Sequence, residues 1–342
     1  MKKLVTIGMD REQEEITKTD VICQITSSGI REWLRGEMIG KGSFATVYIV
    51  QNIIPREGEN ENEKNKEEKN VKYVAKVVNK SSSYKREQML TEIAIHKRFD
   101  HSNIVKLIDN FETNHHVIAL LEYCQDKTLL DYRRKCKIVE EVKAKVWFLQ
   151  VIAGLEYMHN LNVIHRDVKP ENILLHGESV KLCDFGLSAT IGENCCIENI
   201  GSPLYQAPET ISENDSFYRQ LEKTVAKDEK LLKELRESLE FEQYRMRCFG
   251  LDVWSLGVCL YYALIGKHPF NAENRTILND KILNLNYSIP DRAQLWLDET
   301  KLITSRVYIP PNDFKTLING IFVKNDRLTL QQVKTHSFFA SN

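Results

Sequence analysis

The chain has 342 residues, 42% hydrophobic and 28% charged, a composition typical of a folded globular protein. Its 47 basic and 48 acidic residues leave a net charge of −1, which excludes the global positive field that gathers nucleic acid or anionic membrane. The eight cysteines form no C-x-x-C pair, and we find neither a signal-peptide core nor a run of about 18 apolar residues. We therefore expect a soluble, cytoplasmic or nuclear protein that binds neither nucleic acid nor membrane.

The first third of the chain is punctuated by glycine and rich in strand-like runs. Residues 1–32 are mostly polar and are predicted to form a poorly structured lead-in. Residues 57–70 contain only Glu, Asn, Lys and one Gly, so they cannot bury apolar surface. This composition favours a solvated loop inserted at a hairpin tip, where added length costs little free energy, with a docking role as the alternative. The strand-like runs are residues 37–39, 46–50, 71–78, 104–111 and 116–122.

Helical patterns replace strands after the first third. Residues 87–98 already have apolar side chains at helical spacing, and residues 142–159 and 251–265 are predicted to be long helices. The change from strands to helices predicts a boundary near residues 122–126.

Two further insertions are predicted in the helical part. Between residues 212 and 247, apolar residues recur every three, four or seven positions among Lys and Glu, which predicts an exposed amphipathic helix. Its apolar stripe either packs on the parent domain or binds a partner. The stripe consists of Leu221, Val225, Leu232, Leu235 and Leu239.

The second insertion spans about 287–307, because the sequence of residues 287–290 is partly repeated at 308–311.

Two motifs in the β-rich part suggest phosphate binding. A glycine-rich turn, residues 40–47, lies between two strand-like runs, and glycines let backbone amides approach phosphate oxygens closely. A strand follows this turn, whereas a helix follows the glycine-rich turn of a dinucleotide-binding motif, so the turn differs from that motif. Lys76 ends the next strand, and Glu92 on the following helix is the natural carboxylate to fix its ammonium group.

The most specific motif is residues 165–172, His-Arg-Asp-Val-Lys-Pro-Glu-Asn. It places a carboxylate (Asp167), an ammonium group (Lys169) and an amide oxygen (Asn172) within six positions. Twelve residues after Asn172, the sequence Asp-Phe-Gly begins at Asp184 and offers a second hard oxygen ligand of the kind that Mg²⁺ prefers.

With these motifs in order, residues 33–340 resemble a eukaryotic protein kinase. The resemblance implies an α+β, bilobal fold with a β-rich N-lobe at 33–123 and a mostly helical C-lobe at 124–340. It implies ATP- and Mg²⁺-dependent transfer of the γ-phosphoryl group to protein hydroxyls. In that scheme Asp167 orients the hydroxyl and accepts its proton, Lys169 neutralises charge on the phosphoryl group, and Asn172 and Asp184 bind the metal.

The resemblance also implies the nucleotide site and a structural framework around it. Leu121 is the gatekeeper, and backbone groups of Glu122 and Cys124 face adenine. A regulatory column would report the active state, and Arg327 is expected to form an ion pair with Glu209. The expected nucleotide-site residues are Gly40, Lys41, Gly42, Ser43, Phe44, Ala45, Val47, Ala75, Lys76, Glu92, Leu121, Glu122, Cys124 and Leu174. The column consists of Leu107, His96, Phe185 and His165, anchored by Asp252, with His96 either a satisfied core histidine or a pH-sensitive element.

Substrate class and regulation follow from residues near the motif. Lys169 is typical of serine/threonine kinases, and Ser202 occupies the position where the family's threonine contacts the catalytic Asp and Lys. Glu198 stands where many relatives carry a phosphothreonine, so it is expected to pair with Arg166 and support phosphorylation-independent activity; an exposed loop glutamate is the alternative. The adjacent cysteines 195 and 196 are expected to be inert, with redox control as the alternative.

Within the superfamily, the sequence resembles polo-like kinases and the calmodulin-dependent and AMP-activated kinase group equally well. Expected partners are protein substrates with Ser or Thr acceptors, and a further partner is possible through the 212–247 helix. The competing hypotheses are a non-catalytic pseudokinase scaffold and a kinase-fold enzyme acting on a small molecule. The intact Ala207-Pro208-Glu209 sequence, which helps to form a peptide platform in the family, disfavours the small-molecule hypothesis.

Overall fold

The computed structural model describes residues 21–26, 29–42, 44–53, 71–136, 139–193, 195, 199–212, 238–294 and 307–340. The chain divides into two compact units, each described here by itself. The N-terminal unit comprises Met1–Arg86 and Ile108–Tyr123, and the C-terminal unit comprises Glu87–Leu107 and Cys124–Asn342.

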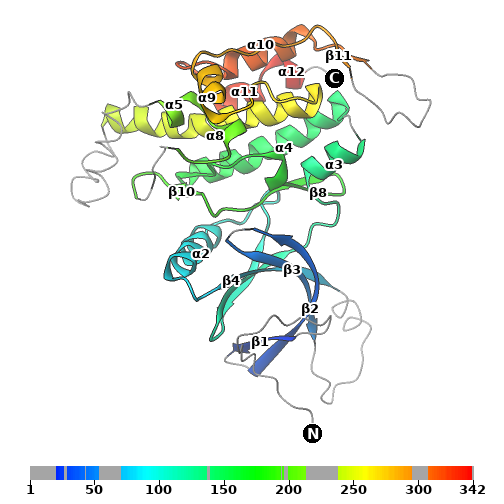
Figure 1. Cartoon of the computed structure of the whole chain (residues 1–342), viewed down its shortest axis with the longest axis vertical. Helices are drawn as coiled ribbons and strands as arrows, with labels where there is room; N and C mark the ends of the chain where they lie inside the picture. The colour runs from blue at the N-terminus through cyan, green and yellow to red at the C-terminus, as the bar shows by residue number, and fades with distance from the viewer. Residues whose placement is uncertain are drawn as a thin grey trace. The chain divides into compact units, whose positions relative to one another are not determined.

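The N-terminal unit is built on a six-stranded sheet (Figure 1). Its strand order is β1-β2-β3-β4-β6-β5, and the pairs from β1 to β4 and between β4 and β6 are antiparallel. The strands are β1 (Val21–Thr26), β2 (Gly29–Lys41), β3 (Thr46–Ile53), β4 (Lys72–Asn79), β5 (Leu107–Glu112) and β6 (His116–Glu122). The predicted β-rich first part is therefore confirmed, and the 57–70 insertion lies outside the described residues.

The expectation that residues 1–32 carry little structure is wrong from residue 21 onwards. β1 pairs antiparallel with β2, with Val21 opposite Leu34 and Thr26 opposite Gly29. The segment Val-Ile-Cys-Gln-Ile-Thr is rich in β-branched residues, which favour strands, and its pairing partner follows after a two-residue connection. The strand signal is confined to residues 21–26 and follows the mostly polar residues 1–20.

One face of this sheet forms a small apolar core. Trp33, Val50, Ala75, Ile118 and Leu120 are buried there and contact one another. Side chains alternate between the two faces along each strand, so residues one position away point to the opposite face. This alternation decides which side chains of β3, β4 and β6 can share a site.

Helix α2 (Ser83–His96) begins in the N-terminal unit and continues in the C-terminal unit. Ile95 belongs to the same hydrophobic cluster as Phe99, Ile104 and Phe185. The predicted N-lobe, residues 33–123, therefore includes a stretch, residues 87–107, whose contacts are made with the C-terminal unit. The boundary predicted from the sequence lies where strands give way to helices, and the sequence does not show that residues 87–107 pack in the C-terminal unit.

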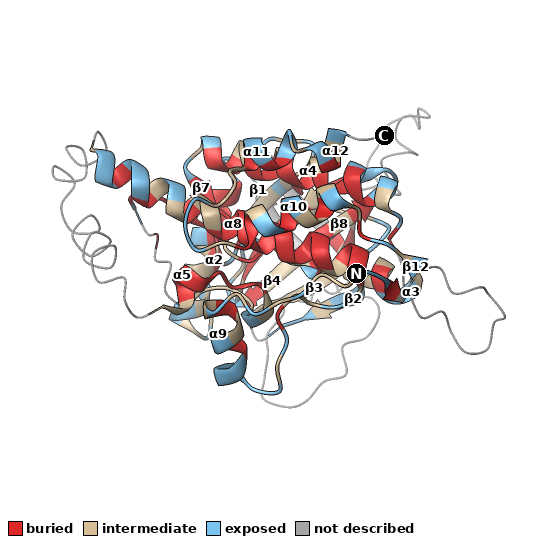
Figure 2. Ribbon diagram, turned by 90° about the horizontal axis from the view of Figure 1, so that it is seen from above, coloured by how far each residue is buried: buried red, intermediate tan, exposed pale blue. Residues whose placement is uncertain are grey.

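The C-terminal unit is mostly helical. Helices α4 and α8 pack against each other, and their buried turns form the centre of the unit (Figure 2). Besides α2, the helices of five or more residues in the described part of this unit are α3 (Leu129–Cys136), α4 (Glu141–Asn160), α8 (Leu239–Ile265), α9 (Arg275–Leu283), α10 (Asn312–Ile321) and α11 (Leu330–Lys334). The shorter elements are β7 (Val163–Ile164), β8 (Ile173–His176), β9 (Ser179–Leu182), β10 (Ala189–Thr190), α5 (Pro208–Ile211), β11 (Ala293–Gln294), β12 (Val307–Tyr308) and α12 (Ser337–Ala340).

Helix α8 is longer than the sequence predicted. It runs without interruption over 27 residues, from an N-cap at Ser238, whose side chain accepts a hydrogen bond from the Phe241 amide, to the left-handed Gly266. The described end of the 212–247 insertion is therefore the first part of the core helix and not a separate helix. Leu239, a member of the predicted stripe, is exposed, whereas Phe241 and Tyr244 are buried. The rest of that stripe lies outside the described residues.

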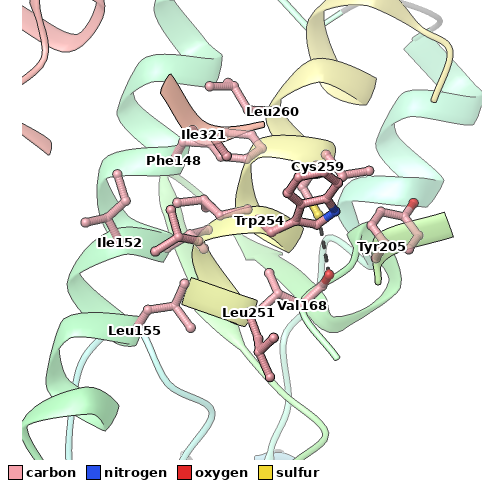
Figure 3. Close-up of a cluster of buried hydrophobic side chains, with 14 of the residues drawn as sticks. Phe148, Ile152, Leu155, Val168, Tyr205, Leu251, Trp254, Cys259, Leu260 and Ile321 are labelled. Carbon is pink, nitrogen blue, oxygen red and sulfur yellow. Dashed lines mark hydrogen bonds between the residues drawn. The ribbon is translucent and has the colours of Figure 1, made fainter. Parts of the chain in front are cut away.

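The apolar character of α8 is explained by packing. Trp254 is fully buried, stacks on Phe270 with ring centroids 5.4 Å apart, and lies among residues of α4 and α10 (Figure 3). Among the residues that the structure describes, α8 is the one helix long and apolar enough to cross a membrane, and 83% of its apolar window is buried in the unit. A helix that is apolar on all sides is expected at the centre of such a core.

The flanks of the predicted 287–307 insertion are anchored. β11 and β12 pair antiparallel, with Ala293 opposite Tyr308, and residues 295–306 between them lie outside the described part of the chain. The Tyr308 hydroxyl donates a hydrogen bond to Glu141 Oε2 at 2.9 Å. Burial, followed by the negative charge of Glu141, raises the pKa of Tyr308.

Candidate active site

A buried aspartate fixes the backbone of the His165–Asn172 motif. Asp252, on α8, accepts hydrogen bonds from the backbone amides of His165 and Arg166, both at 2.9 Å. The His159 ring donates to the same carboxylate at 2.8 Å and stacks on Phe249. Burial acts to raise the pKa of Asp252, but the hydrogen bond from His159, its charge and the contacts with His165 together outweigh burial and lower the pKa. Asp252 is therefore an ionised anchor beneath the loop.

The carboxylate of Asp167 is surrounded by donors. Lys169 Nζ lies 2.6 Å from Oδ2, and Asn172 Nδ2 lies 3.2 Å from the same oxygen. Ser202 donates to Oδ1 through its hydroxyl at 2.8 Å and through its backbone amide at 3.1 Å. Lys169 Nζ also donates to Ser202 Oγ at 2.9 Å. The structure thus brings together four residues that the sequence places up to 35 positions apart.

A β-hairpin explains the spacing between Asn172 and Asp184. β8 and β9 pair with Ile173 opposite Leu182, and the Cys183 amide donates to the Asn172 carbonyl at 3.0 Å. Asp184 is the next residue, so the hairpin returns it to the level of Asn172. The two oxygen ligands predicted for the metal therefore leave the same end of one hairpin.

Gly186 leaves room between two carboxylates. A Cβ at this position would lie 3.3 Å from Glu92 Oε2 and 3.5 Å from Asp184 Oδ1. Because Asn172 Nδ2 is engaged by Asp167, its Oδ1 is the amide atom available to a hard cation. Among the described residues, no group of three or more His, Cys, Asp or Glu side chains forms a metal cage. A two-ligand set matches Mg²⁺, which keeps several waters and shares its shell with phosphates.

The lower part of the expected column is present. The Phe185 ring lies 4.7 Å from the His96 ring and 5.4 Å from the His165 ring, measured between centroids. The His96 Nε2 is 2.6 Å from the Val105 carbonyl, so His96 is a satisfied core histidine, the first of the two alternatives. The contact of Leu107 with this column stays a prediction.

Gly201 positions the segment that carries Ser202. Its φ of 91° lies in the left-handed region, and a Cβ would be 2.5 Å from the Arg166 carbonyl oxygen. Only glycine permits this approach of the activation segment, residues 184–209, to the motif backbone. Ser202 reaches Asp167 as a direct consequence.

The regulatory expectation for Glu198 is not tested, since Glu198 lies outside the described residues. Arg166, its predicted partner, donates from Nε to the Leu187 carbonyl at 2.5 Å. Further along the chain, the predicted pair of Glu209 and Arg327 is confirmed: Nη1 lies 2.6 Å from Oε1 and Nη2 lies 3.0 Å from Oε2.

In the N-terminal unit, the strand register corrects one predicted residue. Val47 is opposite Lys76, whereas Ala75 is opposite Tyr48. Ala75 is fully buried in the apolar core on the other face, so it cannot share a ligand surface with Val47. Val74, two positions before Lys76 and opposite Leu121, lies on the same face as Val47 and takes the place assigned to Ala75.

The glycines of the turn between β2 and β3 are not required by packing. A Cβ on Gly40 or on Gly42 would meet its nearest atoms at 3.7 Å and 3.8 Å, which are ordinary contacts. The turn is closed by a hydrogen bond from the Gly42 amide to the Ala45 carbonyl at 3.0 Å. Room beside these backbones is what a phosphate-binding turn requires. Lys41 and Phe44 are exposed and half-buried respectively, and Ser43 lies outside the described residues.

The remaining predicted nucleotide-site residues are half-buried. Leu121 and Glu122 end β6, and Cys124 follows in the next unit. Leu174 alternates with the buried Ile173 and Leu175, so it points to the opposite face of the β8–β9 hairpin.

Sequence reasoning missed His159, although a histidine at the end of a helix and six residues before His165 was available as a signal.

The chain matches known proteins over most of its length. The protein kinase domain family model matches residues 33–221 and 237–339. The chain is 31% identical over 331 residues to the probable serine/threonine-protein kinase PLK of Dictyostelium discoideum, covering 96% of this chain and 28% of that protein. It is 30% identical over 342 residues to the probable serine/threonine-protein kinase CCRP1 of Zea mays, covering 93% of this chain and 47% of that protein.

A third relative is the serine/threonine-protein kinase plk-1 of Caenorhabditis elegans, 31% identical over 264 residues, or 76% of this chain and 34% of that protein. The chain spans less than half the length of each of these relatives. The matched family residues include those that converge on Asp167. This chain belongs to the protein kinase domain family.

Proposed function

We propose that the chain is an enzyme that transfers the γ-phosphoryl group of ATP, with Mg²⁺, to serine or threonine hydroxyls of protein substrates. The observation that carries this proposal is the donor network on Asp167, formed by Lys169, Asn172 and Ser202. It holds one carboxylate in a fixed orientation.

In the proposed reaction, a substrate hydroxyl approaches the Asp167 carboxylate. The bond from the hydroxyl oxygen to the γ-phosphorus forms as the bond from that phosphorus to the leaving ADP oxygen breaks. The hydroxyl proton passes to Asp167. Lys169, held between Asp167 and Ser202, offers its ammonium charge to the transferred group.

The metal would be held by Asn172 Oδ1 and the Asp184 carboxylate, which the β8–β9 hairpin brings to one end. When bound, Mg²⁺ neutralises charge on the phosphate oxygens. Gly186 supports this assignment because a larger residue would crowd the Asp184 and Glu92 carboxylates.

Nucleotide binding is assigned to two sets of residues, each within its own unit. In the N-terminal unit these are the open turn around Gly40 and Gly42 and the face that carries Val47, Val74 and Lys76. In the C-terminal unit Leu174 presents an apolar, half-buried side chain.

Serine and threonine specificity is supported by Lys169 and by the names of the relatives. The polo-like names among those relatives favour the polo-like group as the subfamily. The substrates are proteins of unspecified sequence. A cytoplasmic or nuclear location is proposed from the composition, and a partner for the 212–247 segment stays a proposal because most of that segment lies outside the described residues.

The test is incorporation of labelled phosphate from ATP into a generic basic protein and a peptide library. We expect Mg²⁺-dependent incorporation by the wild type and at least a hundredfold loss in Asp167→Asn. Asp291→Asn is the matched control, because the side chain of Asp291 is 96% exposed and pairs only at the surface with Lys315.

The alternatives predict different results. A pseudokinase scaffold would bind ATP without Asp167-dependent incorporation. A small-molecule kinase would consume ATP while labelling neither the protein nor any peptide.

A further inference from the structure

Two cysteines that are distant in the sequence lie side by side in the C-terminal unit. The sulfur of Cys195, in the activation segment, is 3.8 Å from the sulfur of Cys248, on α8. Cys248 is fully buried, and Cys195 is 9% exposed. The two residues are 53 positions apart, so their contact is created by the fold and has no signature in the sequence.

The contact is part of a two-point attachment of the activation segment to α8. Tyr244, one helical turn before Cys248, donates its hydroxyl to the Cys195 carbonyl at 3.4 Å. Upstream, the Ile191 amide donates to the Asn162 carbonyl at 2.8 Å. Cys195 itself is therefore held against α8, with its thiol directed at Cys248.

We propose that Cys195 and Cys248 form a redox modification site, in which a hydroperoxide converts the two thiols into an intramolecular disulfide. The sequence favoured an inert Cys195 and left redox control as the alternative; the contact with Cys248 supplies the partner thiol that this alternative requires. A disulfide requires a separation of about 2.05 Å, so the sulfurs must approach by less than one carbon–sulfur bond length, which side-chain rotation can supply.

The chemistry balances in two steps. First, the Cys195 thiol reacts with the hydroperoxide, the O–O bond breaks, and a sulfenic acid and one water or alcohol are formed. Second, the Cys248 sulfur attacks the Cys195 sulfur, the S–O bond breaks, and a second water leaves with the Cys248 proton. The two thiols are together oxidised by two electrons, and the hydroperoxide is reduced by the same two.

The burial of the two cysteines indicates which thiol reacts first with the hydroperoxide. Cys195 reacts first because only its side chain has solvent exposure. Cys248 is fully buried, so it is assigned as the second, resolving thiol.

The disulfide would fix the activation segment in the arrangement seen here. Ser202, seven residues after Cys195, is hydrogen-bonded to Asp167 and Lys169 in this arrangement. We therefore expect the oxidised protein to keep its Ser202 contacts and to become more resistant to protease cleavage within the activation segment, with reversal by dithiothreitol. This expectation is independent of whether the chain is catalytically active.

The direct test is mass spectrometry of the full chain after treatment with hydrogen peroxide, under non-reducing conditions. We expect a mass lower by two hydrogen atoms in most of the protein, and a cross-linked peptide that joins Cys195 to Cys248. Cys196→Ser is the matched control, because it changes the neighbouring thiol and should leave the cross-link unchanged. Cys195→Ser and Cys248→Ala should each abolish it.

A second probe removes the dependence on variants that fail to fold. Phenylarsine oxide binds two neighbouring thiols at once, so the untreated wild type should retain it in the presence of a monothiol, and prior oxidation by peroxide should prevent this. Thermal unfolding of each variant shows whether it is folded. The proposal is overturned if peroxide adds oxygen atoms to the wild type without loss of two hydrogens, or if the cross-link contains Cys196 in place of Cys195.

Discussion

The buried ion pair between Glu209 and Arg327 gives the sharpest prediction about stability. Both side chains are only 7% exposed, and two hydrogen bonds of 2.6 Å and 3.0 Å join them. Arg327 also donates to the carbonyls of Ile321, Gly250 and Val323 at 3.1, 2.7 and 3.0 Å. The pair therefore links α5 to the end of α10 and to α8.

The substitution Arg327→Met leaves the Glu209 carboxylate buried without its counter-charge and removes the donor from three carbonyls. Breaking a buried pair in this way costs about 3–5 kcal/mol, and we expect about 4 kcal/mol here. Glu209→Gln keeps the shape and leaves Arg327 its three carbonyls, so we expect about 3 kcal/mol. The double variant removes both members of the pair and should cost about 4 kcal/mol, well below the sum of the two single changes.

Equilibrium urea unfolding measures these costs, and hydrogen exchange in α8 peptides assigns the loss to the C-terminal unit. Lys315→Met is the matched control. Its partner Asp291 is 3.2 Å away, and the two side chains are 32% and 96% exposed, so the change should cost less than about 1 kcal/mol. An Arg327→Met variant as stable as Lys315→Met, or a double variant equal to the sum, would refute the reasoning.

Three further changes test the framework of the site. Asp252→Asn should cost about 3 kcal/mol in urea unfolding at neutral pH, because an amide cannot accept from both backbone amides and from His159. The pKa of Asp252 in the folded protein is lowered below the ordinary 3.8. This cost should therefore fade as the pH falls below that value. Ser202→Ala removes the hydroxyl that donates to Asp167, so steady-state kinetics should show kcat lowered about tenfold. The KM for ATP should stay unchanged, because the substitution leaves the nucleotide site intact. Gly201→Ala should destabilise the chain by at least about 2 kcal/mol in urea unfolding, because the new Cβ would lie 2.5 Å from the Arg166 carbonyl at a positive φ.

The sequence predicted features that a short stretch of chain determines by itself. The motif from His165 to Asn172 places three polar residue types within six positions, and the structure brings Asp167, Lys169 and Asn172 together. The Glu209–Arg327 pair was predicted although its members are 118 positions apart, because the family resemblance supplied the long-range partner.

What the sequence could not supply depends on three-dimensional register. Ala75 and Val74 are adjacent and equally apolar, and only the pairing of β3 with β4 shows which of them shares a face with Val47. Residues 21–26 became a strand because β2 offered them a partner. The contact between Cys195 and Cys248 arises only when the activation segment folds onto α8.

The central claim is that Asp167 serves the transfer of phosphate to serine and threonine. Its most direct test is a single-turnover reaction with labelled ATP, Mg²⁺ and a protein substrate, followed by phosphoamino-acid analysis of wild type and Asp167→Asn. The network around Asp167 predicts phosphoserine and phosphothreonine from the wild type and at least a hundredfold slower transfer by the variant. Equal rates for the two proteins, or phosphotyrosine as the main product, would contradict the claim.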